Sequence, residues 1–358
     1  METRKIQRVG GGTYTVSVPK RWAVEHDLDA GAEVRLYAHG DGSIVVRSAE
    51  RDGAALDRTE IDIGVGDDGE SVGDDDSEGG NAGPELVRRL LRAAYAAGYE
   101  TVTLRPRDTL TDDQLRAARR TNRGLVGTEV VADAPEEFAL HNVLGTRDVS
   151  VRQTVVQLRF VARSALGQAA VAFDGGREAD LERLRERAEE ADRLFEMVAR
   201  HLNRSLVSMA ELDRLGVDRP ALFDYYVTAE ELAAITELSV AVGGVAADFS
   251  TAVGDRLAAR LEETADDAEA SVAAAATAVL EGASAVDAHG VVADCDGVAA
   301  VLDDVEAAIF DDPDASFDGT AADARALTRL LDALGRIADH SAEIGTVAMR
   351  AAMRPDAE

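Results

Sequence analysis

Residues 4–22 read RKIQRVGGGTYTVSVPKRW and decide the fold of the N-terminus. Apolar and polar side chains alternate over Tyr14–Val18, which is the period-two pattern of a half-buried strand. We expect a first strand over Lys5–Val9, a glycine turn over residues 10–12 and a short helical turn after Pro19. The glycine turn lacks the Lys-Ser/Thr pair and the long helix of a phosphate-binding loop, so a flexible turn is the expected structure.

Residues 28–47 read LDAGAEVRLYAHGDGSIVVR and predict a hairpin. Its strands are expected over Glu33–Ala38 and Ser43–Arg47, joined by a turn whose Asp-Gly pair is a strong hairpin signal. Together these elements form a small β unit over residues 1–48. A unit of this size buries little apolar surface, and it has neither a disulfide nor a cluster of metal ligands, so we expect it to dimerise.

The charges of the chain are distributed unevenly, and its N-terminus is enriched in cations. The 358 residues carry 68 acidic and 38 basic side chains, with a formal net charge of −30. Residues 1–22 hold five cations and one acid, Glu2. Such asymmetry predicts a polyanionic partner for this end alone, although charge that guards a solvated strand edge is the alternative. The predicted DNA-binding residues are Arg4, Lys5, Arg8, Lys20 and Arg21.

Lysine occurs only at positions 5 and 20, and every other basic residue is arginine. An excess of acid with so little lysine indicates a halophilic protein, because carboxylates hold water and cations and keep a surface solvated in concentrated salt. No apolar run reaches the roughly 20 residues that a membrane span needs, and the N-terminus does not resemble an export signal. Cys295 is the single cysteine and cannot form an intramolecular disulfide. We therefore expect a cytoplasmic protein without membrane insertion.

The composition and residue pattern change twice in the middle of the chain. Residues 49–83 contain twelve acids and two arginines, which predicts a solvated linker, although Thr59–Val65 also fits a short strand. Residues 84–146 alternate between helical and strand patterns and predict a small α/β module. The expected helices are Pro84–Gly98 and Thr111–Gly124, and the expected strands are Thr101–Leu104, Thr128–Ala132 and Phe138–Leu144.

Residues 150–352 have the single apolar stripes of long helices in an antiparallel bundle. Val151, Val155 and Leu158, for example, recur at spacings of four and three. The expected helices cover residues 150–173, 178–207, 219–252, 254–281, 285–310 and 319–352. LAAITELS at residues 232–239 aligns with LGRIADHS at residues 334–341, and this internal repeat predicts two tandem three-helix bundles.

Two resemblances to known families follow from these motifs. The order of strand, glycine turn, V-x-V-P-K-x-W and hairpin in residues 3–48 resembles the SpoVT/AbrB type of swapped-hairpin DNA-binding domain. This resemblance implies a domain-swapped dimeric β-barrel whose basic N-terminal face contacts DNA. LGRIADHSAEIG at residues 334–345 is similar to the PhoU family of phosphate-uptake regulators. The whole layout resembles archaeal fusions of the two domains, which implies a multidomain protein concerned with phosphate uptake.

The PhoU resemblance also implies a metal site, from which this sequence departs. The family has a Glu-x-x-x-Asp pair on this helix, whereas Gly335 and Ala233 replace the first carboxylate in the two repeats. We therefore expect no bound cofactor and no tight multinuclear cluster, while a divalent metal stays an open alternative. The candidate metal ligands are Asp339, His340, Glu237, Asp192 and Asp294.

The sequence contains no recognisable catalytic set, because its six histidines are scattered and no nucleotide-binding fingerprint follows a strand. We expect a DNA-binding transcriptional regulator of phosphate homeostasis, a homodimer that binds double-stranded DNA, and not an enzyme. The alternative is an adaptor whose helical domain docks on components of a phosphate transporter or on a signalling partner. In that case the β domain serves mainly to dimerise the chain.

Overall fold

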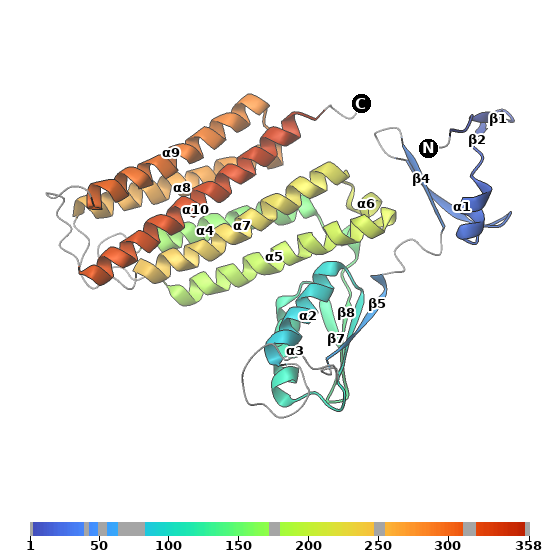
Figure 1. The fold of residues 1–358 in the computed structure, drawn as a ribbon, viewed down its shortest axis with the longest axis horizontal. Helices are drawn as coiled ribbons and strands as arrows, with labels where there is room; N and C mark the ends of the chain where they lie inside the picture. The colour runs from blue at the N-terminus through green and yellow to red at the C-terminus, as the bar shows by residue number, and fades with distance from the viewer. Residues whose placement is uncertain are drawn as a thin grey trace.

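The structure is a computed structural model of the single chain, and it describes residues 3–38, 43–48, 56–63, 83–171, 180–246, 255–310 and 320–354. Along the chain it forms a small N-terminal β part, a sheet with two helices, and a long helical bundle (Figure 1). The expected hairpin turn at residues 40–42 and most of the expected linker, residues 64–82, lie outside the described residues.

The N-terminal β part, residues 3–48, holds two separate two-stranded sheets and one short helix. Its elements are β1 (Gln7–Val9), β2 (Thr13–Thr15), α1 (Lys20–Glu25), β3 (Val34–Ala38) and β4 (Ile44–Ser48). β1 begins two residues later than expected, and β2 ends at Thr15 rather than Val18. With only two strands in each sheet, the described part of one chain does not close the expected β-barrel.

A four-stranded mixed sheet follows, in the strand order β5-β6-β8-β7. β5 is parallel to β6, and the other neighbours are antiparallel. α2 crosses over from β5 to β6, and α2 and α3 lie against the same side of the sheet (Figure 1). The elements are β5 (Arg58–Asp62), α2 (Pro84–Ala97), β6 (Thr101–Arg105), α3 (Asp112–Gly124), β7 (Thr128–Ala134) and β8 (Glu137–Asn142).

β5 corrects the expected extent of the acidic linker. Ile61 and Ile63 alternate with acidic residues, and Ile63 is buried in the core of this sheet. Glu60 of β5 accepts hydrogen bonds from Arg105 of β6 at 3.1 and 3.2 Å. Two of the twelve acids that suggested a linker, Glu60 and Asp62, therefore lie on the exposed side of a strand, and the α/β unit begins before residue 84.

The bundle contains six long helices where the hydrophobic periodicity predicts them. They are α4 (Val151–Ala170), α5 (Leu181–Val207), α7 (Arg219–Ala246), α8 (Asp255–Glu281), α9 (Ala285–Phe310) and α10 (Ala321–Ala352). One short helix, α6 (Met209–Leu215), was not expected. It begins after Ser208 and ends at Gly216, whose φ of +64° is the left-handed conformation that glycine adopts without strain.

The helices pack in two groups that share one apolar core. α4, α5 and α7 pack against one another, as do α8, α9 and α10, and α7 lies along α10. The predicted stripe is fully buried at Val155, Leu158 and Ala162. Burying a valine or leucine completely stabilises a fold by about 1.5–3 kcal/mol. Cys295 is buried as well, and burial raises the pKa of its thiol to about 11.

The sheet unit is joined to the bundle where the C-terminal end of α2 meets α5. Arg200 of α5 donates from Nη1 to the carbonyl oxygens of Tyr95 at 2.9 Å and Tyr99 at 2.8 Å. Its guanidinium carbon also lies 5.0 Å from the centre of the Tyr95 ring. Carbonyl groups at the end of a helix can accept hydrogen bonds from outside it, and they carry the negative end of the helix dipole. The guanidinium group of Arg200 stabilises this end of α2 through both its hydrogen bonds and its positive charge.

Two more side chains of α5 complete this joint. Asn203 donates to the carbonyl oxygen of Ala96 at 2.9 Å, and Arg204 donates to that of Gly98 at 2.8 Å. Gly98 has a φ of +104°, and a Cβ atom there would lie 2.5 Å from Cγ of Arg204. Glycine is therefore required at residue 98 both for the backbone conformation and for the close approach of α5.

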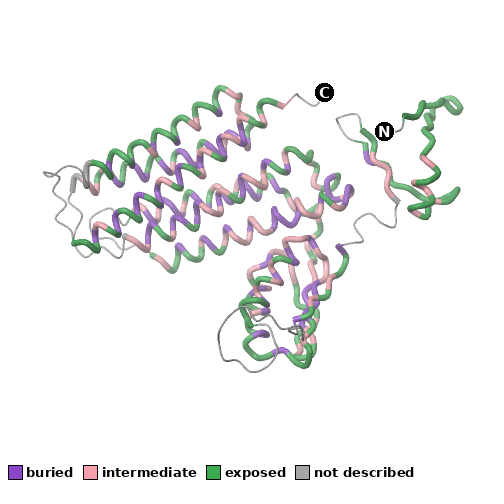
Figure 2. The backbone as a smooth tube through the Cα atoms, in the orientation of Figure 1, coloured by how far each residue is buried: buried purple, intermediate pink, exposed green. Residues whose placement is uncertain are grey.

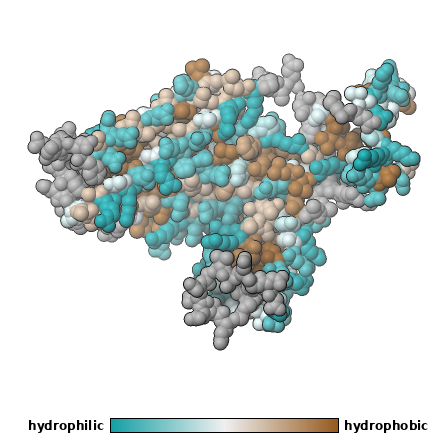
Figure 3. All heavy atoms as spheres, viewed as in Figure 1, coloured by the Kyte–Doolittle hydropathy of each residue, from teal (hydrophilic) through white to brown (hydrophobic). Residues whose placement is uncertain are grey.

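Burial separates the three parts of the chain. Figure 2 shows buried residues along the inner faces of the bundle helices and in the sheet unit, whereas the N-terminal β part is almost wholly exposed. Figure 3 shows exposed hydrophobic residues beside hydrophilic ones in that N-terminal part. Over the described ranges, none of the helices is both long enough and apolar enough to cross a membrane.

Glu196 of α5 is a half-buried carboxylate at the α2–α5 contact, with its side chain 13% exposed. Its Oε1 lies 3.3 Å from Nη1 of Arg92 on α2. Its buried Oε2 has no hydrogen-bond partner within the described part of the chain. Burial raises the pKa of Glu196 to about 7, and the charge of Arg92 offsets this only in part.

We expect Glu196→Gln to stabilise the folded chain at alkaline pH. The folded chain binds this proton more tightly than the unfolded chain, so the carboxyl favours folding below its ordinary pKa of 4.5. That contribution is lost as the pH rises through about 7, whereas an amide does not ionise. The variant should gain on the order of 2 kcal/mol at about pH 8. Chemical denaturation at several pH values measures the difference.

The control is Glu189→Gln, which removes an exposed carboxylate from the same helix. It should leave the dependence of stability on pH unchanged. If the stabilities of the parent chain and of Glu196→Gln run parallel between about pH 5 and pH 8, the carboxyl does not carry the assigned shift.

Candidate nucleic-acid interface

The cationic N-terminus begins with the β1–β2 hairpin. Arg8 of β1 pairs with Tyr14 of β2, and the two strands are joined by a glycine turn. Gly10 in this turn has a φ of +68°, which favours glycine at that position. Nη2 of Arg8 donates to the carbonyl oxygen of Gly11 at 3.1 Å. One predicted DNA contact is therefore tethered to the turn by its own side chain.

The structure places the five predicted DNA contacts in two groups. Arg4 lies before β1, because the ladder with β2 begins at Gln7, whereas Arg8 lies within β1. Lys20 opens α1 directly after Pro19. Figure 1 shows the β1–β2 hairpin and α1 at opposite ends of the N-terminal part. All five side chains are exposed: Arg4, Lys5, Arg8, Lys20 and Arg21.

The apolar side chains of the same part are exposed as well. Tyr14 is 69% exposed and Leu36 66%, and within the described residues of 3–48 the one buried hydrophobic side chain is Tyr37. The others with large exposed fractions are Ile6, Val9, Val16, Val18, Val24, Val34 and Ile44. Apolar side chains gathered on a surface mark an interaction site, so we expect a partner surface to pack against this part.

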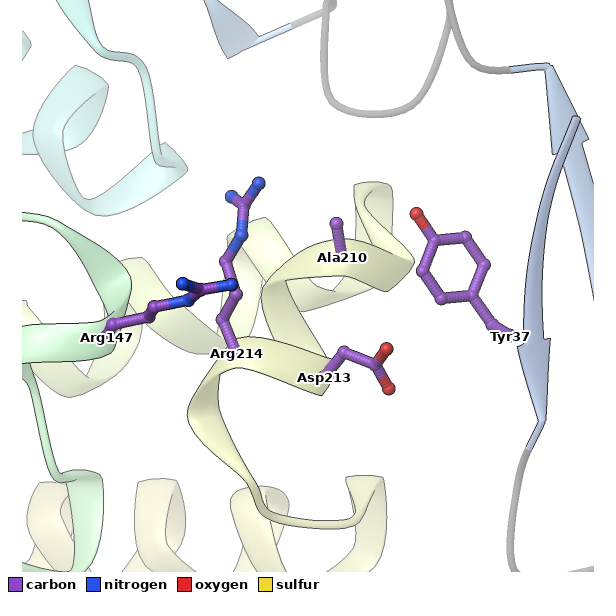
Figure 4. Close-up of a pocket in the computed structure, with 5 residues that line it drawn as sticks. All are labelled: Tyr37, Arg147, Ala210, Asp213 and Arg214. Atoms are coloured by element: carbon purple, nitrogen blue, oxygen red, sulfur yellow. The ribbon is translucent and has the colours of Figure 1, made fainter. Parts of the chain in front are cut away.

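The β3–β4 hairpin touches the bundle at α6. Tyr37 points from β3 toward α6 and lines a pocket of about 400 Å³ (Figure 4). Arg147 and Arg214 lie on the opposite side of this pocket, and Ala210 and Asp213 complete its wall. Arg47 of β4 also donates to the carbonyl oxygen of Val207 at the end of α5. These contacts connect the cationic part to the bundle.

The candidate metal ligands do not come together in the structure. Oδ2 of Asp192 lies 3.5 Å from Nη1 of Arg92. His340 is hydrogen-bonded to Glu231 of α7 rather than to Asp339. The other candidates, Glu237 and Asp294, are exposed, as is Asp339. Among the residues that the structure describes, no three His, Cys, Asp or Glu side chains form a group that could hold a metal ion.

A buried polar cluster on α5 and α6 was missed by the sequence reasoning. Nδ1 of His201 lies 2.8 Å from Oε1 of Glu211, and Nε of Arg204 lies 3.2 Å from Oε2. Burial raises the pKa of Glu211, but the hydrogen bond from His201 and the charge of Arg204 outweigh it and lower this pKa to about 2. The run RHLNR at residues 200–204 was the available signal, because it places cations on the buried side of an amphipathic helix.

Comparison with known proteins gives a match to this end of the chain. Residues 7–53 match the family described as antidote-toxin recognition MazE, bacterial antitoxin. No curated protein and no solved structure matches the chain. The match supports an N-terminal domain of the SpoVT/AbrB-like kind. Such domains form a regulatory, non-catalytic family, and the match is consistent with a DNA-binding regulator.

We expect the full chain to be a dimer in molar KCl, and we expect Val16→Asp to make it a monomer. Val16 is 56% exposed in the single chain and belongs to the surface that a second copy would cover. A carboxylate buried there without a partner costs several kcal/mol, which would outweigh a modest interface. Sedimentation velocity measures the mass of both proteins.

The matched control is Val286→Asp on α9, where the valine is 79% exposed and far along the chain from the β part. It makes the same change of charge and should leave the dimer intact. A monomeric parent chain, or a Val16→Asp variant that stays dimeric, would show that the exposed apolar surface is not the dimer interface.

Proposed function

We propose that this protein is a dimeric transcriptional regulator whose N-terminal β part binds double-stranded DNA. One observation carries the proposal: residues 1–22 hold five cations and one acid on a chain with a net charge of −30. The chain as a whole is strongly acidic, so an N-terminus enriched in cations favours this end for contact with a polyanion. The match of residues 7–53 to a regulatory family supports the same assignment.

The dimer gives the two cationic groups a way to act together. In the single chain the β1–β2 hairpin and the start of α1 lie apart, and the apolar side chains between them are exposed. Strand exchange with a second copy, as the resemblance to swapped-hairpin domains implies, would cover these side chains. It would also present two copies of each cationic group to one duplex, related by a two-fold axis.

The rest of the chain is assigned to reception of a signal. We assign residues 1–48 to the DNA-binding domain, 49–83 to a linker region from which β5 joins the sheet, 84–146 to the rest of the α/β module and 150–352 to a PhoU-like domain of two three-helix repeats. The packing of α4, α5 and α7 in one group and α8, α9 and α10 in another supports the two repeats. The resemblance of residues 334–345 to the PhoU family supports phosphate supply as the signal.

Concentrated salt would decide which interactions hold this regulator on DNA. At about 1 M salt the Debye length is only about 3 Å, and the release of counterions contributes little to affinity. Binding then depends on close contacts of guanidinium groups with phosphates and base edges. Arginine suits this role because its planar fork can hold a phosphate or a guanine edge at two points. Three of the five predicted contacts are arginines.

The double substitution Arg4→Ala plus Arg8→Ala should leave a folded dimer that no longer holds its promoter. A good base contact contributes about 1–3 kcal/mol of discrimination, and a dimer would lose four arginines. We expect at least a hundredfold loss of affinity in molar KCl, measured by fluorescence anisotropy with a promoter fragment that the parent chain protects. In cells, the variant should misregulate phosphate-transport genes as a deletion does.

The control is Arg325→Ala plus Arg329→Ala, which removes two exposed arginines four residues apart on α10. It makes the same change of net charge and should bind the promoter as the parent does. If the Arg4 and Arg8 variant keeps parental affinity, this face is not the DNA site. Loss of DNA binding with unaltered phosphate genes would keep the DNA assignment and reject the phosphate assignment.

A further inference from the structure

A second group of cations lies on α3 of the sheet unit. Residues 114–128 hold four arginines and no acid, in a chain with 68 acids among 358 residues. The four are Arg116, Arg119, Arg120 and Arg123. None of them belongs to the predicted DNA contacts, which all lie within residues 1–22. Figure 1 shows α3 apart from that N-terminal part.

The four arginines form one face of the helix. Side chains that are three and four residues apart lie on the same side of an α-helix, and the arginines keep this spacing from residue 116 to residue 123. All four are exposed, and we call them the arginine face of α3. The opposite side of the helix faces the core of the sheet unit, and its buried residues are Gln114, Leu115, Ala118 and Thr121.

The helix that carries this face is held firmly in the sheet unit. Its first turn is closed by a capping box, in which the backbone nitrogen of Thr111 donates to Oε1 of Gln114 at 2.7 Å. The backbone nitrogen of Gln114 donates in return to Oγ1 of Thr111 at 3.3 Å. α3 also packs against α2, β7 and β8. The arginines therefore project from an element whose position is set by the sheet.

Two of the four arginines are paired with carboxylates of the sheet unit, and two are not. Arg119 donates from Nε and Nη2 to Asp133 of β7, at 2.9 and 2.8 Å. Arg116 donates to Asp113, which precedes it by three residues. Arg120 and Arg123 form no hydrogen bond or ion pair with any residue that the structure describes. Two guanidinium groups on this face are therefore open to an anion.

The arrangement works against the stability of the isolated helix. Like charges three or four residues apart repel one another on a helix surface. The helix dipole favours Arg123, which lies in the last turn, but its effect falls off before Arg120. A partner that brings negative charge to the arginine face would remove this repulsion.

The composition of the face favours nucleic acid over an acidic protein as that partner. Interfaces between proteins have a core with few charged residues, whereas interfaces with DNA are much more positively charged. The fully exposed side chains of α3 are all charged. From Arg116 to Arg123 the face measures about 10 Å along the helix axis. That length spans about three phosphates of one DNA strand, which advance roughly 3.4 Å each along the duplex.

We infer that the arginine face of α3 is a second binding surface for double-stranded DNA and that it contacts the phosphate backbone. Arg120 and Arg123 supply the open guanidinium groups, and Arg116 and Arg119 flank them. Phosphate contacts carry no direct sequence information, so this surface holds duplex of any sequence. Because it lies apart from the N-terminal part, it holds a separate stretch of DNA. The inference goes beyond the proposed function and stands whether or not the N-terminal part binds a promoter.

The test uses the full chain with Arg4→Ala plus Arg8→Ala, in which the N-terminal contacts are weakened. Fluorescence anisotropy with a long duplex of random sequence measures the remaining affinity, at the lowest KCl concentration at which circular dichroism finds the chain folded. We expect this variant to keep a weak binding that does not depend on sequence. Adding Arg120→Gln plus Arg123→Gln should weaken that binding by about 10- to 100-fold, because two charge-assisted contacts are lost.

The dependence of the affinity on salt gives a second measurement. The logarithm of the affinity falls with the logarithm of the salt concentration, with a slope of about −0.9 for each phosphate contact. Loss of Arg120 and Arg123 should make this slope less steep by about 2 for each chain on the duplex. Replacing both with lysine keeps the charges and should keep the slope. Glutamine and lysine both suit an exposed helix position, so all variants should have the helicity of the parent.

The matched control is Arg325→Gln plus Arg329→Gln on α10, which makes the same change of net charge at two exposed residues. It should bind the random duplex as its background does. Equal affinity with and without Arg120 and Arg123 would overturn the inference.

Two further outcomes would also overturn it. One is the absence of any binding to the random duplex by the chain with Arg4→Ala plus Arg8→Ala. The other is a smaller mass in sedimentation velocity without a change in DNA affinity when Arg120 and Arg123 are replaced, which would assign the face to an acidic protein surface. Loss of promoter recognition on replacing Arg4 and Arg8 concerns the proposed function alone, so the two failures are distinguished.

Discussion

The capping of α2 by α5 is the interaction on which the arrangement of this chain depends. A helix ends with carbonyl groups that have no partner inside it, and α2 has no basic residue in its own last turn. Arg200, Asn203 and Arg204 donate from α5 to the main-chain oxygens of Tyr95, Ala96 and Gly98 at this end. The same contacts set the sheet unit against the bundle.

A second constraint is electrostatic and separates the two ends of the chain. The helices carry most of the acid, and Figure 3 shows many hydrophilic residues on their exposed faces, mixed with apolar ones. The N-terminal part combines exposed cations with exposed apolar side chains, a combination that suits a partner surface rather than solvent. The contacts of Tyr37 and Arg47 with the end of α5 and with α6 are the points at which these two regions meet.

The elements with strong periodicity could be predicted from sequence, and those fixed by tertiary contacts could not. The long helices follow from stripes such as Val155 and Leu158, and α3 follows from the capping box of Thr111. The alternation of Ile61 and Ile63 allows a strand at β5, but the acids around it favour a linker, and only the pairing with β6 decides between the two. The five cationic residues could be identified from the sequence. The position of Arg4 relative to Arg8 depended on the residue at which β1 begins. The polar cluster around Arg200 appears only when α2, α5 and β8 meet in space.

The joint at the end of α2 also bears on how such a chain can change over time. Four of its hydrogen bonds from α5 are received by main-chain oxygens, which every amino acid possesses, and a fifth joins Arg204 to the carboxylate of Glu100. Apart from Gly98, the residues that end α2 can be exchanged without removing a main-chain acceptor, whereas Arg200 and Arg204 cannot be replaced so freely. The recognition is thus encoded mostly on one side, and covariation is expected mainly at the pairs Arg204–Glu100 and Glu196–Arg92. A foreign sheet module whose helix ends in the same glycine turn could be grafted onto this bundle and would find its donors already in place.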